Sequence, residues 1–504
     1  MATDRNSFPP MEPGFQRNML LVTTLFISIV AAIDMTIVTV ALPYMAGNLS
    51  ATPDEITWVV TMFAVGQAIT IGITGHLSRL LGRKTLALSA VAGFVVLSIA
   101  CAMAQSLHQI VIFRLLQGAF CGPLIPLSMS MLIDAYPVKE RTRALSLWAM
   151  GVMGGPALGP AIGGYLAQHL DWRWNFLVNL PVGVIAVVLI LRFVRVVKPL
   201  QVRTDWLGLI LLVIFLITFQ VALDQGNRLN WFESLDFMLL NVCAITAFIA
   251  FVGRGLLRGE DNIIDLMLLR DINFSASALL MAVCGSFFLS LLVLTPQILI
   301  DLYGWEVETA GMVIGAYGSA GMLGAILSSR LVVYLGVRLM VVLAFLLFAL
   351  GWFLFSRVNL DAGMSQVMLP GIIIDFALML IFPLLSAQAF SSLPTRLRDE
   401  GAGLFNLLKA LGFAFGTTFV TTLVYRGSQF NWNVYGGLLS PANPGYTAYL
   451  QSGGLANGSA QAGAELSMLL STQSSMVTML QTMEALVVLS ICAIPLVFFL
   501  RKQA

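Results

Sequence analysis

Residues 19–41 read MLLVTTLFISIVAAIDMTIVTVA, a run with a single charged side chain, Asp34. The hydrocarbon core of a bilayer is about 30 Å thick, and a helix needs roughly 20 apolar residues to cross it. Lipid offers the backbone no hydrogen-bond partner, so a segment of this composition crosses as a helix. The run therefore predicts a transmembrane helix with one carboxyl group inside the bilayer.

The whole chain is also richer in apolar residues and poorer in charged residues than a soluble protein. Of its 504 residues, 58% are hydrophobic and 10% are charged, whereas soluble domains average about 45–50% and about 25%. The three histidines and five cysteines are scattered singly along the sequence, which predicts no metal site, no redox pair and no cofactor. The basic residues lie in short loops rather than in one patch, so we expect no nucleic-acid partner.

Further apolar runs predict fourteen transmembrane helices in an all-α polytopic membrane protein. Their expected positions are near residues 19–41, 56–78, 85–104, 109–133, 143–168, 175–197, 205–223, 237–253, 274–300, 308–329, 338–357, 366–391, 401–425 and 477–500. Lys and Arg collect in alternate loops, as they do on the cytoplasmic side of membrane proteins. Both termini are therefore predicted to be cytoplasmic, and the outer loops carry only Arg173, Arg228, Arg357 and Arg426.

A weak internal repeat divides these helices into two sets. Leu81-Gly82-Arg83-Lys84 follows the second predicted helix, and Leu335-Gly336-Val337-Arg338 follows the second helix of the later set. Transporters commonly consist of two halves related by such a repeat. We therefore expect a cytoplasmic tail over 1–18, a six-helix bundle over 19–197, two inserted linker helices over 198–270 and a second six-helix bundle over 271–504.

One long loop is predicted on the outer side, over residues 427–476. It is rich in Gly, Ser, Asn, Gln and Tyr and nearly uncharged, and a loop of this length is more often functional than a simple connector. Residues 459–475 within it favour a helix lying at the surface. At the other end of the chain, the first apolar run is too long for a signal peptide.

Five ionisable side chains within predicted helices are each a functional hypothesis, because lipid disfavours charge: Asp34, Arg114, Asp375, Lys409 and Glu484. For Asp34 we favour a proton carrier over a structural carboxylate, and for Arg114 a gating or charge-balancing role over a structural pair. The two alternatives are even for Asp375, whereas Lys409 and Glu484 favour a structural or cavity-lining role over coupling. The candidate set for a substrate cavity or charge balance is Gln67, Gln117, Asp375, Asn406, Lys409 and Glu484.

The fifth predicted helix carries the sequence GVMGGPALGPAIGG over residues 151–164. Small residues four positions apart form a smooth stripe that another helix can approach closely, and prolines bend the helix that contains them. We interpret this motif as a bendable seam between two moving bundles. Its residues are Gly151, Gly155, Pro156, Gly159, Pro160, Gly163 and Gly164.

Motifs in four predicted helices resemble the fourteen-helix drug:proton antiporter branch of the major facilitator superfamily. They are the run from Ile33 to Pro43, Arg114-x2-Gln117-Gly118, Gly155-x3-Gly159-Pro160-x2-Gly163-Gly164, and Asn406-x2-Lys409, in which Lys replaces Arg. The resemblance extends over nearly the whole chain. It implies the major facilitator fold, with two six-helix bundles and two inserted helices, and it links Asp34 and Arg114 to proton coupling.

This resemblance also implies a secondary active transporter rather than an enzyme. Such a protein exports amphipathic or hydrophobic compounds across the bacterial inner membrane in exchange for protons, as in multidrug efflux and antibiotic resistance. Similar pumps work with a periplasmic adaptor protein and an outer-membrane channel. The sequence contains no G-x-x-x-x-G-K-[ST] phosphate loop, so we expect no ATP hydrolysis. The alternatives are a dedicated exporter of one endogenous product, such as a siderophore or fatty acid, and a sensor that kept the fold without transport.

The loop after the second helix departs from the pattern of that superfamily. It reads GHLSRLLGRK over residues 75–84, with Arg79 where the family has aspartate and Leu80 where it has arginine. In the family this aspartate helps to latch the two halves together, so its replacement puts the latch in doubt. The predicted gating-loop residues are Gly75, Arg79, Gly82, Arg83 and Lys84.

Overall fold

The computed structural model describes residues 11–197, 199, 204–258, 263–440, 442–453 and 459–500, and every regular element within these ranges is a helix. The first helix begins at Phe15, before the predicted end of the tail at residue 18. Met11 is already buried, and its backbone N–H donates to the carbonyl of Ala135 at 2.9 Å. Residues 1–10 of the predicted tail lie outside the described residues.

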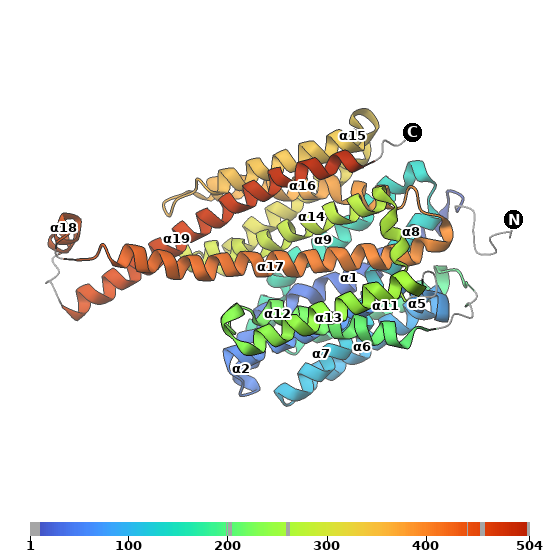
Figure 1. Cartoon of the computed structure of the whole chain (residues 1–504), viewed down its shortest axis with the longest axis horizontal. Coiled ribbons are helices and arrows are strands. Elements are labelled where there is room, and N and C mark those ends of the chain that lie inside the picture. Colours follow the sequence, from blue (N-terminus) through green and yellow to red (C-terminus); the bar gives the residue numbers. More distant parts are fainter. Residues whose placement is uncertain are drawn as a thin grey trace.

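The elements from α1 to α11 correspond to the predicted first bundle, which we call the N-terminal half (Figure 1). They are α1 (Phe15–Ile37), η1 (Thr39–Ala41), α2 (Leu42–Asn48), α3 (Pro53–Ile56), α4 (Trp58–Gly72), α5 (Thr74–Leu81), α6 (Arg83–Ala102), α7 (Leu107–Cys121), α8 (Leu124–Ala135), α9 (Val138–His169), α10 (Trp174–Leu177) and α11 (Asn179–Phe193). The inserted pair follows, with α12 (Trp206–Gln225), η2 (Trp231–Glu233) and α13 (Leu235–Arg258).

The C-terminal half follows the inserted pair. Its elements are η4 (Leu266–Arg270), α14 (Ile272–Pro296), η5 (Gln297–Leu302), α15 (Val307–Phe355), α16 (Met364–Ala389), η6 (Thr395–Leu397), α17 (Arg398–Gly436), α18 (Pro444–Ser452), α19 (Ala460–Ala493) and η7 (Ile494–Phe499). The first and last described residues lie at one end of the molecule, which we call the terminus side, and the opposite end is the far side (Figure 1).

Twelve helices of the described chain are long and apolar enough to cross a membrane, or thirteen if α4 and α5, which are bent by 61°, form one span. α15 covers two of the predicted helices and is divided at Gly336, whose backbone is not helical. The observed spans are therefore compatible with the fourteen helices predicted from the sequence.

The two glycines of the internal repeat adopt the same kind of backbone. Gly82 has a φ of 81° and Gly336 a φ of 72°, in the region that glycine enters at no steric cost. Each lies between two helical stretches, Gly82 between α5 and α6 and Gly336 within α15. The four-residue repeat thus corresponds to the same turn in both halves.

The inserted pair packs on both halves. α12 contacts α4 in the N-terminal half and α17 in the C-terminal half. Asp205 at the start of α12 accepts hydrogen bonds from Arg254 Nη2 at 2.7 Å and Arg254 Nε at 2.8 Å, which fixes α13 to α12. These helices are therefore part of the transmembrane bundle as well as a connection between its halves.

The segment predicted as an outer loop, residues 427–476, is mainly helical within its described part. α17 continues to Gly436 and α19 already begins at Ala460. Figure 1 shows these ends of α17 and α19 extending beyond the other helices on the far side, with α18 at the tip. The helix expected over 459–475 is present, but it projects from the bundle instead of lying on its surface.

Polar contacts join α17 and α19 near the start of this projection. Asn431 Nδ2 on α17 donates to Thr478 Oγ1 at 2.8 Å and to Gln481 Oε1 at 3.1 Å on α19. These contacts favour continued helices at this end of α17 and α19. Local composition does not reveal such contacts, because the partners lie in distant parts of the sequence.

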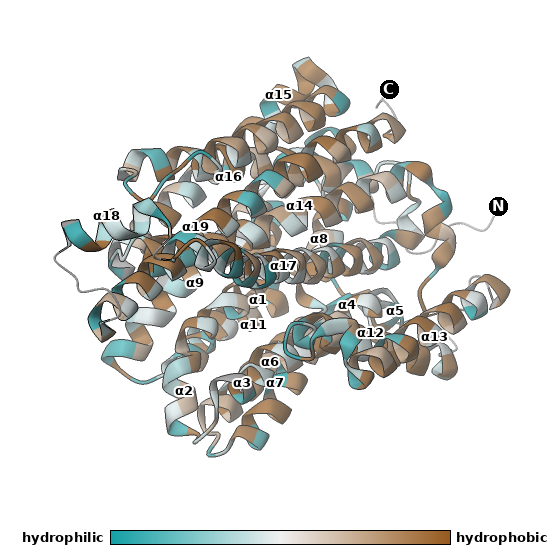
Figure 2. Ribbon diagram, turned by 60° about the vertical axis from the view of Figure 1, so that its left-hand side comes forward, coloured by the Kyte–Doolittle hydropathy of each residue, from teal (hydrophilic) through white to brown (hydrophobic). Residues whose placement is uncertain are grey.

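Apolar side chains cover the outside of the bundle as well as its interior (Figure 2). Val96, Val188 and Leu239 are 63%, 59% and 58% exposed. In water a large apolar surface would promote association, whereas a membrane-spanning surface must be apolar. The exposed surface is therefore that of a multi-pass membrane protein.

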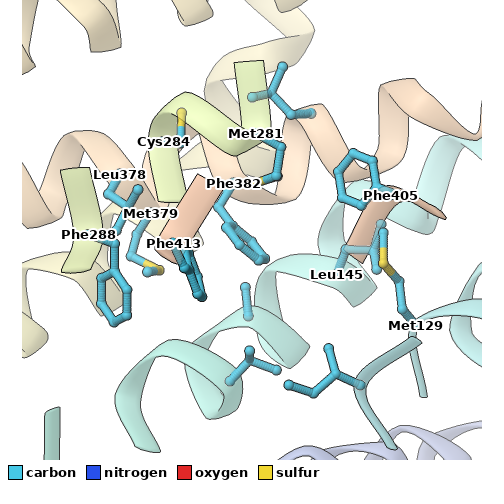
Figure 3. Close-up of a cluster of buried hydrophobic side chains, with 14 of the residues drawn as sticks. Met129, Leu145, Met281, Cys284, Phe288, Leu378, Met379, Phe382, Phe405 and Phe413 are labelled. Carbon is cyan, nitrogen blue, oxygen red and sulfur yellow. The ribbon is translucent and has the colours of Figure 1, made fainter. Parts of the chain in front are cut away.

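The two halves also meet over buried apolar side chains. Figure 3 shows Phe405 of the C-terminal half beside Met129 and Leu145 of the N-terminal half. Asn406, which follows Phe405 on α17, donates from Nδ2 to the Met129 sulfur at 3.5 Å. The halves are thus in direct contact between α17 and α8.

Candidate functional site

Asp34 and Arg114 form a buried ion pair in the N-terminal half. Arg114 Nη1 on α7 lies 2.6 Å from Asp34 Oδ2 on α1, and their side chains are 1% and 0% exposed. Taking two charges out of water is costly, and their mutual attraction offsets that cost only with good geometry and further hydrogen bonds. The two residues predicted to couple protons are therefore direct partners.

Polar side chains from two more helices complete the surroundings of this buried pair. Asn179 Nδ2 on α11 donates to Asp34 Oδ1 at 2.8 Å, so both carboxylate oxygens accept a hydrogen bond. Arg114 Nη1 also donates to Gln117 Oε1 at 2.8 Å, and Gln117 Nε2 donates to Ser98 Oγ on α6 at 2.8 Å. The network links α1, α6, α7 and α11.

A central cavity of about 500 Å³ lies between the halves, within the range of small-molecule binding sites. Its walls come from α1, α4, α9, α14, α15 and α17, and from α12 of the inserted pair. The lining is mainly apolar and includes Phe63, Phe288 and Phe413. Its polar side chains are Thr36, Thr39, Gln67, Gln220, Asp224, Asn406, Lys409 and Thr417.

The buried pair adjoins this cavity. Thr36 lies two residues after Asp34 on α1 and contributes to the cavity wall. Phe63 also lines the cavity, and its ring centroid is 3.9 Å from Arg114 Cζ. An aromatic face attracts a guanidinium group, so Phe63 contacts the ion pair on one side and the cavity on the other.

The structure separates the predicted cavity residues into distinct places. Gln67, Asn406 and Lys409 line the central cavity, whereas Gln117 belongs to the network around the buried pair. Glu484 is exposed on α19 and is not among the residues that line the cavity. Of the predicted set, the central cavity therefore receives Gln67 from α4 and both Asn406 and Lys409 from α17.

Asp375 occupies a second, smaller cavity in the C-terminal half. Its side chain on α16 is 7% exposed and faces this cavity together with Tyr317. Phe288 lines both cavities. Within the described residues, no group of three His, Cys, Asp or Glu side chains is arranged to hold a metal ion.

The glycine stripe of α9, formed by Gly151, Gly155, Gly159 and Gly163, packs on α1. A Cβ added at Gly155 would lie 2.8 Å from Ala32 Cβ, and one added at Gly159 would lie 2.1 Å from Thr36 Oγ1. Only glycine permits this approach. The stripe is close to the helix that carries Asp34, so the packing of α9 and the position of the ion pair are connected.

The expectation of a seam between two bundles is wrong for this stripe, because both α1 and α9 belong to the N-terminal half. Another face of α9 takes part in the boundary between the halves, where Val152, Pro156 and Pro160 line the central cavity. Gly154 and Gly164 face open space, since a Cβ added at either would meet nothing within 4 Å. Spacing identified the stripe but not its partner.

The predicted gating loop contacts the C-terminal half through an ionic cluster on the terminus side. Arg79 Nη1 lies 2.7 Å from Glu400 Oε1. Arg83 bridges the halves, with Nε 2.8 Å from Asp399 Oδ2 and Nη1 2.6 Å from Asp134 Oδ2. The members of this ionic cluster are Arg79, Arg83, Asp134, Arg398, Asp399 and Glu400.

The other gating-loop residues have different roles. Gly75 allows α5 to touch α17, because a Cβ there would lie 2.5 Å from Glu400 Cα. Lys84 donates from Nζ to the carbonyl of Leu191 at 2.7 Å, within its own half. The replacement of aspartate by Arg79 therefore leaves an ionic contact between the halves in place, with the acid supplied by α17.

Several residues of these sites were missed in the sequence. Asn179 and Ser98 are ordinary polar residues within predicted helices, and nothing local connects them to Asp34. Asp399 and Glu400 carry a clearer signal, since they are adjacent acids on the side where basic residues predominate. Asp224 was missed as a cavity residue because the seventh predicted helix ends at residue 223, whereas α12 continues to Gln225.

Comparison with known sequences finds relatives along most of the chain. The family described as Major Facilitator Superfamily matches residues 24–417. The chain is 32% identical to the multidrug export protein EmrB of Escherichia coli (strain K12) over 451 residues, which cover 88% of each chain. It is 33% identical to the fatty acid resistance protein FarB of Neisseria gonorrhoeae over 397 residues, which cover 78% of each chain.

A solved structure has the same fold. The human organic anion transporter MFSD10 (TETRAN) matches 95% of this chain and 99% of its own, with a TM-score of 0.60. The two sequences are 14% identical. At this identity the likeness concerns the fold alone.

Proposed function

Because this chain belongs to the Major Facilitator Superfamily, we propose that it is a proton-coupled antiporter that exports amphipathic or hydrophobic compounds. It is a membrane transporter and not an enzyme. The observation that carries the proposal is the buried pair of Asp34 and Arg114 beside a cavity between the two halves. An ionisable pair inside a membrane bundle commonly marks a proton or ion pathway.

Asp34 is the proton-binding group in this mechanism. While it is ionised, Arg114 and Asn179 hold its two oxygens. A proton on the carboxyl group removes the attraction between the charges, so α1 is held less tightly to α7. Thr36 and Phe63 form part of the cavity wall next to this pair, so the movement changes the cavity and links proton binding to substrate release.

The ionic cluster determines which side of the cavity is closed. It joins α5, α6 and α8 of one half to the start of α17 in the other. In this conformation the halves are held together on the terminus side. In the proposed cycle these contacts break to admit substrate from that side and form again to release it on the far side.

The cavity chemistry supports amphipathic substrates. Its walls are mainly apolar, with aromatic rings and few polar groups, which is the usual composition of sites for small organic molecules. The relatives named multidrug export protein, such as EmrB of Escherichia coli, support export of more than one compound. We therefore propose multidrug efflux as the physiological activity.

The proposal includes a location and partners. The positive residues of the terminus-side loops favour a cytoplasmic position for both termini, in the bacterial inner membrane. On the far side, α17 and α19 project beyond the bundle (Figure 1). This projection would reach a periplasmic adaptor protein, which in turn would connect the pump to an outer-membrane channel.

A dedicated exporter of one endogenous product remains the second candidate. The relative FarB of Neisseria gonorrhoeae is named a fatty acid resistance protein, and a fatty acid is an apolar chain with one carboxylate. The buried cation Lys409 in the cavity wall favours such a substrate. Both candidates use the same proton-coupling pair.

Extrusion of a lipophilic fluorescent dye from cells tests the proposed function. Cells expressing the chain should extrude the dye, and extrusion should stop when a protonophore is added or when Asp34 is replaced in Asp34→Asn. Asp171→Asn makes the same chemical change at a half-exposed surface residue and should extrude normally. Gradient-dependent extrusion by the Asp34→Asn protein would reject Asp34 as the coupling residue.

A further inference from the structure

Lys409 is a buried cation in the wall of the central cavity. Its side chain on α17 is 4% exposed. Its Nζ lies 5.3 Å from the ring centroid of Phe382 and 5.8 Å from that of Phe413, and Figure 3 shows these two rings close together in the C-terminal half. Aromatic faces attract an ammonium group, but they do not supply the hydrogen-bond acceptors that it requires.

Within the described residues, no side chain or carbonyl forms a hydrogen bond or ion pair with Lys409 Nζ. Arg114 differs, because it has Asp34, Gln117 and the Val59 carbonyl as partners. A buried charge is costly unless it is paired and hydrogen-bonded. Among the described residues, Lys409 is therefore a buried amine in the cavity wall without a hydrogen-bonding partner.

The acidic side chains around the cavity are otherwise engaged or lie elsewhere. Asp34 is held by Arg114 and Asn179. Asp224 on α12 accepts hydrogen bonds from Gln220 and Thr61. Asp375 lies in the second cavity beside Tyr317. None of them is paired with Lys409.

The position of Asp224 also separates it from Lys409. The carbonyl of the preceding residue, Leu223, accepts a hydrogen bond from Thr418 Oγ1 at 3.3 Å, so Asp224 lies at the level of Thr418. Thr418 follows Lys409 by nine positions on α17, which corresponds to about 13 Å along a helix. Lys409 therefore marks the terminus-side part of the cavity, and Asp224 marks the far-side part.

A second unused polar group lies next to Lys409. Asn406, one helical turn earlier, also lines the cavity. Its Nδ2 donates to the Ala402 carbonyl at 2.9 Å, which fixes the orientation of the amide, and its Oδ1 is buried without a partner in the described structure. The cavity thus has a polar end, where Lys409 and Asn406 lie one helical turn apart on α17.

We propose that Lys409 binds the anionic head of the exported compound, so that the cavity selects amphipaths with one negative group and an apolar body. A carboxylate, sulfonate or phenolate would pair with Nζ, and the apolar body would pack on Phe63, Phe288 and Phe413. This inference rests on the proposed export function, and it narrows the substrates from amphipathic compounds in general to anionic ones.

Equilibrium binding to the purified full-length protein in detergent tests this assignment without any proton gradient. The probes are dansyl-labelled undecanoic acid, its neutral methyl ester and a dansyl-labelled alkyl amine, followed by fluorescence. The wild-type protein should bind the acid more tightly than the ester or the amine. Lys409→Gln should weaken binding of the acid at least about tenfold, the usual effect of a lost charge-assisted hydrogen bond, while binding of the ester changes little.

Two further variants serve as controls. Lys409→Arg keeps the charge and should retain the preference for the acid. Lys139→Gln makes the same substitution at an exposed lysine that lines a separate cavity between α9 and α15. It should bind all three probes normally, and weaker binding of the acid by this variant would place the site in that other cavity. Binding of the ester by Lys409→Gln shows that the variant is folded.

Equal weakening of acid and ester by Lys409→Gln, unchanged binding of both, or a wild-type preference for the amine would overturn the assignment. Failure of the transport proposal gives a different result. In that case the acid would bind through Lys409 as predicted, but gradient-driven movement of the acid would be the same in Asp34→Asn as in the wild-type protein.

Discussion

At the scale of single residues, Asp34 and Arg114 differ in how many other partners each has. Asp34 has two partners, Arg114 and Asn179. Arg114 has Asp34, Gln117, the Val59 carbonyl and the ring of Phe63. Loss of the carboxylate therefore leaves the arginine with several contacts, whereas loss of the arginine leaves a buried carboxylate with one neutral donor.

This difference predicts unequal effects on stability. Arg114→Met should cost about 3–5 kcal/mol, the usual effect of leaving a buried charge unpaired, and should lower the thermal unfolding midpoint in detergent. Asp34→Asn should lower it less. The double variant should be more stable than Arg114→Met alone but still inactive in transport.

The result that would contradict this account is equal destabilisation by the two single variants, with no recovery in the double variant. That outcome would mean that the side chains do not act as a pair. Measuring the two singles and the double together forms a double-mutant cycle, which isolates their interaction from other effects.

The residues of this pair were predictable individually, because a charge within an apolar run of transmembrane length is rare and costly. Their pairing could not be predicted from the sequence. Asp34 and Arg114 are separated by 80 positions and Asp34 and Asn179 by 145, so no local spacing links them. Asn179 is neutral and common in composition, and only the packing of α11 against α1 gives it a role.

At the scale of elements, α1 is held between its charge partners on one side and α9 on the other. The glycine stripe brings α9 close enough for Thr36 Oγ1 on α1 to donate to the Pro156 carbonyl at 3.0 Å. That bond satisfies a carbonyl within the proline-containing part of α9. Because these helices are in close contact, we expect a movement of α1 to shift the cavity face of α9 as well.

Filling this contact should impair both stability and transport. In Gly159→Ala the new Cβ would lie 2.1 Å from Thr36 Oγ1, and overpacking of this kind typically costs about 1–3 kcal/mol. Gly164→Ala is the matched control, because its Cβ would meet nothing within 4 Å. Thermal unfolding and dye transport should fall for Gly159→Ala and stay near wild type for Gly164→Ala. Comparable behaviour of the two variants would exclude a packing role for the stripe.

Helices inside the bilayer could be predicted from length and hydropathy, since lipid leaves the backbone few alternatives. Outside the bilayer this constraint is absent. The far-side end of α17 was predicted as loop, and that of α19 as a helix lying at the surface. The contact that joins them, Asn431 with Thr478, links distant segments and could not be predicted from the sequence. The partner of the glycine stripe was missed for a related reason, because a sequence shows which face is smooth but not which helix covers it.

At the scale of the whole molecule, the two halves are joined by charges on the terminus side and separated by the cavity farther in. The sequence of the gating loop put in doubt an ionic latch between the two halves, since Arg79 replaces the family's aspartate. The acids lie on α17 instead, as Asp399 and Glu400. An ionic contact between the halves requires opposite charges on both of them. The sequence of the gating loop alone therefore could not show that the contact is kept.

Charge reversal tests whether this ionic cluster acts in transport. Arg79→Glu and Glu400→Arg each place like charges next to each other across the halves and should slow dye transport about fivefold or more, in line with coupling energies of about 1 kcal/mol or more for contacting residues. The combined variant restores opposite charges and should recover much of the rate. If the combination is as slow as the single variants, the contact between these two residues is not a latch.

The central claim is that a proton on Asp34 drives export, and transport by purified protein in liposomes tests it most directly. With an imposed pH gradient and no other energy source, wild-type protein should move the dye against its concentration gradient, and Asp34→Asn protein should not. Both proteins should still bind the dye in the absence of a gradient. Gradient-driven accumulation by Asp34→Asn, at a rate close to wild type, would contradict the account.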